Sequence, residues 1–432
     1  MQTNDLRELW QALDDEERLA GFRTLSREEA EEFFVTMPAR DAAELLLALP
    51  TTERKTWMRL IPPDDAADIL QEVDDDERVA LLGLLDELNR KEVAVLLAYA
   101  EDDAGGLMST RFARVRPSMR VDEALLYLRR QAREHLETIY YVYVLDQEQH
   151  LLGVASLREL FTAPPDSTVK DVMRDAVISV TENMDQEAVG RLFRHYGLLA
   201  VPVLDAERRM KGIVTMDDIV DVVDEEATED AQKFGGMEAL DEPYLETKFW
   251  VMWNKRAGWL AVLFFGEMLT ASAMGHFEQD IEKAVVLAMF VPLIISSGGN
   301  SGSQASTLVI RAMALGELRA RDALKVARRE LASGLALGSL LGVFGFLRVV
   351  VWETFFGGYG PHTALIGATV GISLVSVVLL GTLAGSMLPL LLHKVGFDPA
   401  SASAPLVATL VDVTGLVIYF TVASVLLAGT LL

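Results

Sequence analysis

An aspartate, Asp412, stands inside the last apolar stretch of the chain, Pro405-Leu-Val-Ala-Thr-Leu-Val-Asp412-Val-Thr-Gly-Leu-Val-Ile-Tyr419. A charged side chain near the centre of a membrane costs about 2.5–3.5 kcal/mol on insertion scales, so it should face water or a partner. At 1.5 Å per residue, Asp412 lies about 10 Å along a helix from Pro405. The structural alternative is an interhelical salt bridge, but the candidate arginines stand at the ends of apolar stretches or in loops. We therefore predict a functional carboxylate.

A second polar feature is the run Ser296-Ser-Gly298-Gly299-Asn300-Ser-Gly302-Ser-Gln304, which interrupts another apolar stretch. Such a run is tolerated in a membrane only where protein buries it or where it lines a wet cavity. The alternative is close helix packing, because Gly298 and Gly302 form a G-x-x-x-G pair. The two are compatible, and Asn300 and Gln304 favour a pore lining.

These residues offer hard oxygen ligands. We count one pore carboxylate per chain, surrounded by hydroxyls and carbonyls, with no intramembrane His and no Cys in the chain. This ligand set suits Mg2+, Ca2+ or Mn2+ and disfavours zinc and copper. Mg2+ gives up its water reluctantly, so a sparse site for a hydrated ion is plausible chemistry. One carboxylate is too few alone, which predicts a symmetric dimer with two Asp412 side chains near its axis.

The elements that must position these residues are membrane spans. The apolar stretches are roughly 257–276, 284–313, 331–352, 363–392 and 405–430. Each reaches the ~20 residues needed to cross ~30 Å of hydrocarbon. The loop between the second and third stretches is basic (Arg319, Arg321, Lys325, Arg328, Arg329), whereas the loop before the second is acidic on balance. The positive-inside rule then places the N-terminus in the cytoplasm and the C-terminus outside.

The remaining residues are strongly acidic. Of the chain's 39 basic and 64 acidic residues, 11 and 10 fall in 249–432, which leaves 28 and 54 in 1–248. Such a surface repels nucleic acid and attracts cations, although a plain solvated surface would have the same composition. The first residues lack a basic start and an apolar run, so we expect no signal peptide. No nucleophile–base pair or phosphate-binding loop stands out, so we expect no enzyme.

Two internal repeats divide the acidic part. Residues 1–107 have the pattern of short amphipathic helices with an imperfect repeat at Pro38 and Pro62, which predicts a superhelical stack. Further on, Val142-Tyr-Val-Leu-Asp146 and Gly153-Val-Ala-Ser156 recur 59 residues later as Val201-Pro-Val-Leu-Asp205 and Gly212-Ile-Val-Thr215. Each copy is predicted as strand, turn, strand and helix. A helix after the second copy carries Asp217, Asp221 and Asp224 on one face, where a divalent cation would relieve their repulsion.

The two copies resemble tandem CBS domains, which pair and often bind adenine nucleotides. Thr215 and Asp218 of the second copy resemble the hydroxyl and carboxylate that hold a nucleotide ribose, and the first copy, with Ser156 and Glu159, is a poorer match. The resemblance implies ATP as a possible ligand, and the alternative is a purely structural pair.

The whole chain resembles the MgtE magnesium transporters. The match is densest at Ala98–Met108, Glu226–Asp230, Gly298–Gln304 and Pro405–Tyr419. It implies a multidomain protein: an all-α superhelical domain (1–107), an α/β tandem CBS pair (108–167 and, with an acidic linker, 168–230), a connecting helix (231–256) and an all-α membrane domain of five helices (257–432). It also implies a homodimer in the plasma (bacterial inner) membrane, with Mg2+ as substrate and regulator and the pore at the subunit interface.

The resemblance assigns roles residue by residue. Asp412 matches the pore carboxylate. The pore-lining positions are Gly298, Gly299, Asn300, Gln304, Ala404 and Thr409. Cytosolic Mg2+ would close the pore by bridging acidic sensor residues, here Asp64, Asp68, Glu187, Asp218, Asp221, Glu226, Glu229 and Asp230. Two positions depart from the family: Gly197 replaces a sensor carboxylate, and Ala404 stands where Asn or Gly is frequent.

We therefore expect a Mg2+-selective channel that mediates uptake and that cytosolic Mg2+ closes. The alternatives are a divalent-cation transporter of broader selectivity that also carries Mn2+ or Co2+, and an ion-coupled exporter that uses Asp412 as a relay. A membrane-anchored nucleotide sensor is a further alternative, but an anchor needs neither Asp412 nor the polar run around Asn300.

Overall fold

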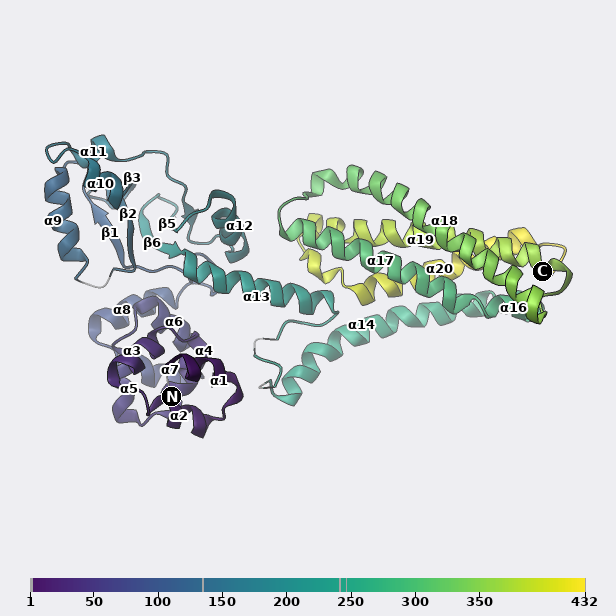
Figure 1. The fold of residues 1–432 in the computed structure, drawn as a ribbon, viewed down its shortest axis with the longest axis horizontal. Coiled ribbons are helices and arrows are strands. Elements are labelled where there is room, and N and C mark those ends of the chain that lie inside the picture. The colour runs from purple at the N-terminus through teal and green to yellow at the C-terminus, as the bar shows by residue number, and fades with distance from the viewer. Residues whose placement is uncertain (1–2, 134–135, 241, 246, 432) are drawn as a thin grey trace. The chain divides into compact units, whose positions relative to one another are not determined.

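The structure, a computed structural model, describes residues 3–133, 136–240, 242–245 and 247–431. The chain divides into two compact units, residues 1–223 and 224–432. Figure 1 labels most of the helices and strands of both units. The first unit holds the helical domain and both repeat copies, and the second holds the long apolar helices, so the predicted multidomain fold class is confirmed.

Short helices make up the N-terminal domain. Serine and aspartate caps start several of them: Asp14 and Glu17, and likewise Ser26 and Glu29, form reciprocal capping boxes. The second, fourth, sixth and eighth helices pack in succession, as a superhelical stack requires. The helices are α1 (Thr3–Leu9), α2 (Asp15–Phe22), α3 (Arg27–Val35), α4 (Ala39–Ala48), α5 (Thr51–Met58), α6 (Pro63–Gln71), α7 (Asp75–Leu82) and α8 (Glu87–Leu96), with a 3-10 turn η1 (Trp10–Ala12).

Each repeat copy forms a three-stranded sheet with flanking helices. The first copy contains β1 (Phe112–Val115), α9 (Val121–Gln131), β2 (Thr138–Leu145), β3 (Leu151–Ser156) and α10 (Leu157–Thr162). After α11 (Val169–Val172), the second contains β4 (Val180–Thr181), α12 (Gln186–Tyr196), β5 (Ala200–Leu204), β6 (Met210–Thr215) and α13 (Met216–Phe234). In each sheet the first two strands are parallel and the last two antiparallel. The predicted strand–turn–strand–helix units are confirmed.

The two copies exchange the segments that precede them. Ser109, before the first copy, pairs with Ile213 on β6, and Arg174, before the second copy, pairs with Val154 on β3. A side chain at Gly212 would meet the Ser109 carbonyl oxygen at 2.6 Å, and one at Gly153 would meet the Arg174 carbonyl oxygen at 2.9 Å. Both glycines are therefore required for this close backbone approach. The exchange explains why the two copies form one body.

The predicted connecting helix over 231–256 differs from the observed structure. α13 continues through the acidic residues and ends at Phe234, and the described residues between Gly235 and Lys248 form turns and irregular chain. The next helix, α14, begins at Phe249. Gly235 and Gly236 explain the end of α13, because Gly236 adopts φ 78°, a conformation that terminates helices. The predicted helix over 231–256 therefore does not form as one element, because its first residues belong to α13 and its last residues to α14.

Five stretches of helix in the described part of the second unit are long and apolar enough to cross a membrane. They correspond in order to the predicted spans. The elements are α14 (Phe249–His276), the short α15 (Glu278–Lys283) and α16 (Val285–Ala288), α17 (Val291–Ala314), α18 (Ala323–Phe356), α19 (Thr363–Val395) and α20 (Ala404–Leu427), with 3-10 turns η2 (Ala320–Asp322), η3 (Gly360–His362) and η4 (Pro399–Ser401). Within this unit α17, α19 and α20 lie side by side (Figure 1).

Glycines set the packing of these helices. A side chain at Gly381 would meet the Gly298 carbonyl oxygen at 2.4 Å, and one at Gly385 would meet the Gly302 carbonyl oxygen at 2.0 Å. The backbones of α17 and α19 therefore touch at two successive turns, as small residues allow in membrane helices. The G-x-x-x-G pair of α17 is thus a packing device, and so are Gly381 and Gly385 of α19.

Candidate functional site

The opposite side of α17 is polar and exposed. Ser296, Asn300 and Gln304 recur every four residues and are all exposed, and the Asn300 amide donates to the Ser296 hydroxyl at 3.4 Å. The glycines Gly298 and Gly302 of the same helix are buried against α19 and α20. α17 is therefore amphipathic within an apolar stretch, with one face for packing and one face of amides and hydroxyls.

Asp412 lies beside the glycine run. A side chain at Gly299 would come within 3.8 Å of the Asp412 carboxylate oxygen Oδ1, and Gly298 lies against Val411 on the preceding position of α20. The Asp412 side chain is half-buried. Among the described residues no Lys or Arg charge acts on Asp412, so the salt-bridge alternative has no support. The predicted pore residues Gly299, Asn300 and Asp412 thus come from two adjacent helices.

Polar contacts tie the ends of these helices together. The Ser306 hydroxyl donates to the Ala402 carbonyl oxygen at 2.9 Å, and the Ser303 hydroxyl donates to the Ala404 carbonyl oxygen at 3.4 Å. These contacts hold the start of α20 against α17. Ala404 therefore lies at the end of the polar run of α17.

The end of α13 is held by an ion pair to the loop that precedes α20. The Lys233 ammonium contacts Asp398 at 2.7 Å and also pairs with Glu229. Burial opposes protonation of Lys233, but its hydrogen bonds to Asp398 and Glu229 outweigh this cost and raise the Lys233 pKa. The predicted sensor residue Glu229 is therefore already neutralised by a lysine of its own helix.

A second carboxylate, besides Asp412, lies within an apolar helix of the described residues. Glu267 stands in α14, the first apolar helix, among exposed apolar neighbours that include Phe265, Met268 and Leu269. Among the described residues, Glu267 is the charged group that acts on Asp412. Its charge in an apolar run is the same sequence signal that marks Asp412.

A second group of carboxylates gathers in the first unit. Asp64 and Asp65 start α6, and Asp217 and Asp218 start α13, while Glu137 precedes β2. The charges of these groups act on one another across the helical domain and the repeat copies. We call these five residues the acidic cluster. Two predicted sensor residues, Asp64 and Asp218, belong to it, and the sequence pattern missed Asp65 and Glu137.

Burial and mutual repulsion raise the pKa values in the acidic cluster. Burial, then the charges of Asp64 and Asp218, raise the pKa of Asp65 to about 7. Burial and Asp217 raise that of Asp218 to about 7, although Thr215 hydrogen bonds oppose the change. Burial and the same carboxylates raise that of Glu137 to about 8. Ionisation of these carboxylates therefore costs free energy through desolvation and mutual repulsion. A bound divalent cation would offset this cost.

Asp64 contributes to the acidic cluster a buried carboxylate oxygen, Oδ1, that accepts no hydrogen bond from the described residues. Burial raises the Asp64 pKa, and a hydrogen bond with the Ser109 side chain opposes the rise. Desolvation and the charges of Asp65 and Asp64 also raise the pKa of Asp68, to about 8. The Asp68 side chain is exposed, so water screens this repulsion.

The other predicted sensor residues lie elsewhere. Glu187 is in the first turn of α12 and pairs with Arg191 at 2.6 Å. Asp221, Glu226 and Asp230 lie along α13, beyond the acidic cluster. Gly197, the position predicted to lack a sensor carboxylate, ends α12 at φ 61°, a conformation that glycine adopts readily.

The nucleotide-binding prediction names Thr215 and Asp218. Both the amide and the hydroxyl of Thr215 donate to the Asp218 carboxylate, at 3.2 and 2.7 Å, so the pair caps the start of α13. A pocket of about 780 Å³ lies instead beside the first copy, with Tyr140, Ser156 and Arg158 in its wall. Glu159 of this wall accepts from Ser156 and Arg174. The sequence, in contrast, predicts a nucleotide at the second copy.

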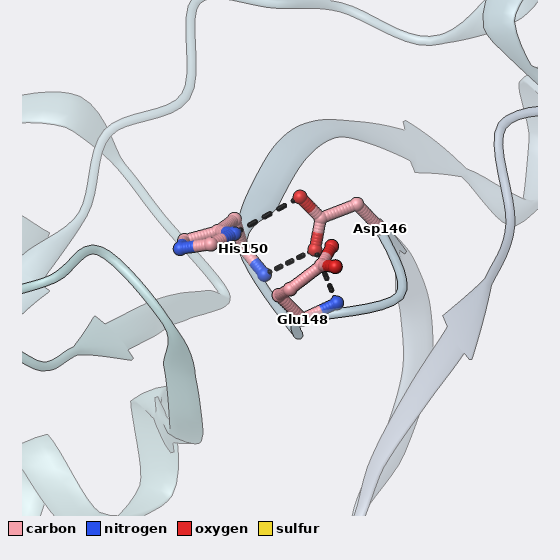
Figure 2. A group of neighbouring side chains, drawn as sticks. All are labelled: Asp146, Glu148 and His150. Atoms are coloured by element: carbon pink, nitrogen blue, oxygen red, sulfur yellow. Dashed lines mark hydrogen bonds and ion pairs between the residues drawn. The ribbon is translucent and has the colours of Figure 1, made fainter.

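Asp146, Glu148 and His150 bring three possible metal ligands within 4.8 Å of one another (Figure 2). Asp146 accepts from the Glu148 and His150 amides at 2.9 and 2.8 Å and contacts the His150 ring at 2.9 Å. The second copy builds the same turn around Asp205, with Arg209 in place of the histidine. The turn therefore forms without a metal ligand at that position, and we assign the trio a structural role.

Comparisons with known proteins agree on one family. A model of the MgtE family, described as a divalent cation transporter, matches residues 291–422, a model of the MgtE intracellular N domain matches 1–102, and a CBS domain model matches 104–166 and 169–225. The magnesium transporter MgtE of Thermus thermophilus is 44% identical over 80% of this chain and 75% of its own. That of Enterococcus faecalis is 37% identical over 77% of this chain and 71% of its own.

A similar solved structure is the cytosolic domain of the Mg2+ channel MgtE in complex with ATP. It is 40% identical and covers 51% of this chain and 90% of its own, with a TM-score of 0.48.

Proposed function

Since the chain belongs to the MgtE family of divalent cation transporters, we propose that it carries Mg2+ across the membrane through a pore that two copies form together. The observation that carries the proposal is the meeting of Asp412 with the glycine run of α17, at 3.8 Å from a side chain built at Gly299. A carboxylate with amides and hydroxyls nearby suits a hydrated Mg2+, because this ion retains several of its waters.

The exposure of polar side chains on a membrane helix supports the proposed dimer. Asn300 and Gln304 are exposed in one chain, and lipid cannot satisfy their amides. A second copy placed on this face by two-fold symmetry would enclose both polar faces and both Asp412 side chains around one axis. The basic loop after α17 favours a cytoplasmic N-terminus in the plasma membrane and an external C-terminus.

Regulation by cytosolic Mg2+ is the second part of the proposal. The acidic cluster holds carboxylates at raised pKa values, and the buried Asp64 oxygen has no partner among the described residues. Mg2+ bound there would link α6 of the helical domain to α13 of the second copy. α13 continues to Lys233, whose contact with Asp398 reaches the loop before α20. Binding would thus favour one arrangement of the helix that leads to the pore.

Ion flux in proteoliposomes tests the pore. We expect the wild-type chain to pass Mg2+ without dependence on a proton or sodium gradient, and Asp412→Asn to lose nearly all flux at normal membrane abundance. Glu278→Gln, which removes an acidic side chain of the short α15, is the matched control and should retain flux. Wild-type rates for Asp412→Asn would refute the pore assignment.

The same assay separates the alternatives. Coupling of Mg2+ flux to a proton gradient would favour an exporter, and equal rates for Mg2+, Mn2+ and Co2+ would favour a transporter of broader selectivity. If the acidic cluster regulates the pore, Mg2+ on the cytoplasmic side should lower the flux of the wild-type chain. The Asp65→Asn variant should lose this inhibition.

We also propose that the pocket beside the first repeat copy binds ATP. Tyr140 and Phe161 offer exposed aromatic faces for a base, and Arg158 and Arg174 offer positive charge for phosphates. Asp218, in contrast, lies among carboxylates that repel phosphate. Calorimetric titration of ATP into the full chain should show binding that Arg158→Ala weakens and that Thr215→Ala leaves unchanged. The reverse pattern would place the nucleotide at the second copy.

A further inference from the structure

Glu267 is an acidic residue of α14, a helix that packs against few other residues of the chain. α14 is almost entirely exposed in one chain, and Thr270 is its buried residue. Phe264, Phe265 and Leu269 around Glu267 are apolar and exposed, as lipid contact or a subunit interface requires. A glutamate among them is expensive in lipid, so membrane carboxylates almost always face water or a partner.

The register of α14 against α20 sets the depth of Glu267. Trp259 donates to the Ser403 hydroxyl at 3.2 Å, and a side chain at Gly266 would meet Thr409 at 2.7 Å. Further along, the rings of Phe277 and Phe420 stack at 5.1 Å. The two helices therefore run parallel in constant register.

This register places Glu267 level with Leu410, two residues before Asp412. Two residues correspond to about 3 Å along a helix axis. The charge of Glu267 acts on Asp412, in agreement with this placement. Two carboxylates from different helices therefore lie at one depth of the apolar layer.

A third group points to a polar ligand at this depth. Thr270 follows Glu267 by three residues and so lies on the same side of α14. It is 8% exposed, and its buried hydroxyl has no hydrogen-bond partner among the described residues. By the same register Thr270 lies level with Val413, so Glu267 and Thr270 stand on either side of the level of Asp412. A water or ion-bound water would satisfy this hydroxyl.

We propose that Glu267 is a second carboxylate of the cation path, which acts with Asp412 on the same hydrated ion. The proposal rests on the transport function proposed above and deepens it. Two like charges at one depth repel each other, and a divalent cation between them removes that repulsion. Glu267 would thereby strengthen the preference for divalent over monovalent cations without replacing Asp412.

Cysteine accessibility tests whether water reaches Glu267, because the chain has no native cysteine to interfere. In proteoliposomes, Glu267→Cys should react with a membrane-impermeant, positively charged methanethiosulfonate, and millimolar Mg2+ should slow the reaction. Leu269→Cys, at an exposed position of the same helix, is the matched control and should react slowly. Reaction of Glu267→Cys no faster than the control, or unaffected by Mg2+, would overturn the proposal.

Flux supplies an independent readout. Glu267→Gln should raise the half-saturating Mg2+ concentration about three- to tenfold, as loss of one charge near a divalent ion predicts. Glu267→Asp, which keeps the charge, should stay close to wild type and controls for folding. A Glu267→Gln variant with wild-type half-saturation and wild-type exclusion of Na+ would refute the proposal. Absence of flux through the wild-type chain would instead refute the transport function itself.

Discussion

Single side chains in this protein carry charge where it is costly. Asp412 and Glu267 stand in apolar helices, and Asp65 and Asp218 lie packed among other carboxylates. In each case the unfavourable energy is the reason to infer a cation, because a divalent ion converts repulsion among carboxylates into attraction. The Asp146 turn shows the opposite case, since its polar atoms already satisfy one another.

Asp65→Asn should stabilise the chain in Mg2+-free buffer at pH 8. The folded-state pKa of Asp65 is raised to about 7 from 3.8, so its ionisation lowers stability as pH rises from about 4 through 7. With allowance for screening by water, the gain at pH 8 is about 1–2 kcal/mol, and it vanishes near pH 4. Thermal melting of the full chain at both pH values measures it.

Asp76→Asn is the control for this prediction, because Asp76 is an exposed acidic residue of α7 outside the acidic cluster. An equal rise of melting temperature in both variants would show that net charge, rather than the acidic cluster, sets the effect.

The helices of the membrane domain obtain their specificity from small residues. α17 packs closely on α19 through Gly298 and Gly302, and this contact turns the amides of α17 to the other side. One face of α17 therefore packs against α19 while the other presents polar side chains. Substitution of one of these glycines should disturb both the packing and the position of the polar side chains.

Gly385→Ala should separate α17 from α19. A methyl group there would lie 2.0 Å from the Gly302 carbonyl oxygen, and backbone cannot yield as a side chain can. We expect a loss of about 1–3 kcal/mol, typical of overpacking, with reduced Mg2+ flux. Thermal melting in detergent and flux in proteoliposomes measure the two effects.

Gly275→Ala is the matched control, because nothing lies within 4 Å of the added methyl group. If Gly385→Ala melts and transports as Gly275→Ala does, the proposed close contact is absent in the folded protein.

The whole molecule combines a charged unit and an apolar unit joined by α13. Because the acidic cluster draws on α6, α13 and the residue before β2, cation binding there depends on the fold of the entire first unit. A ligand that binds only the folded state stabilises it by mass action. Mg2+ should therefore act on the full chain as a stabilising ligand.

Millimolar Mg2+ should raise the melting temperature of the full chain at pH 8 and have little effect at pH 5.5. At pH 5.5, groups whose pKa is raised to about 7 or 8 are largely protonated and bind Mg2+ poorly. NaCl at matched ionic strength controls for screening of surface charge. An equal effect of Mg2+ at both pH values would argue against the acidic cluster as its site.

Composition and periodicity alone predicted the five spans, the repeated strand–turn–strand units, the acidic first half and Asp412. These features are local, because each depends on apolar runs, alternation or a single charge within a short window. The continuous connecting helix over 231–256 was wrong, because the pattern did not show that Gly236 ends α13 and that irregular chain separates it from α14.

Only the tertiary structure brought distant residues together. Asp65 and Glu137 join Asp218 because α6, β2 and α13 meet, and Glu267 reaches the depth of Asp412 because α14 and α20 share a register. The sequence by itself determined which residues are costly in their surroundings. The fold decided which of these residues lie close together. Their proximity arises from packing between elements that are far apart in the sequence, so no short stretch of sequence shows it.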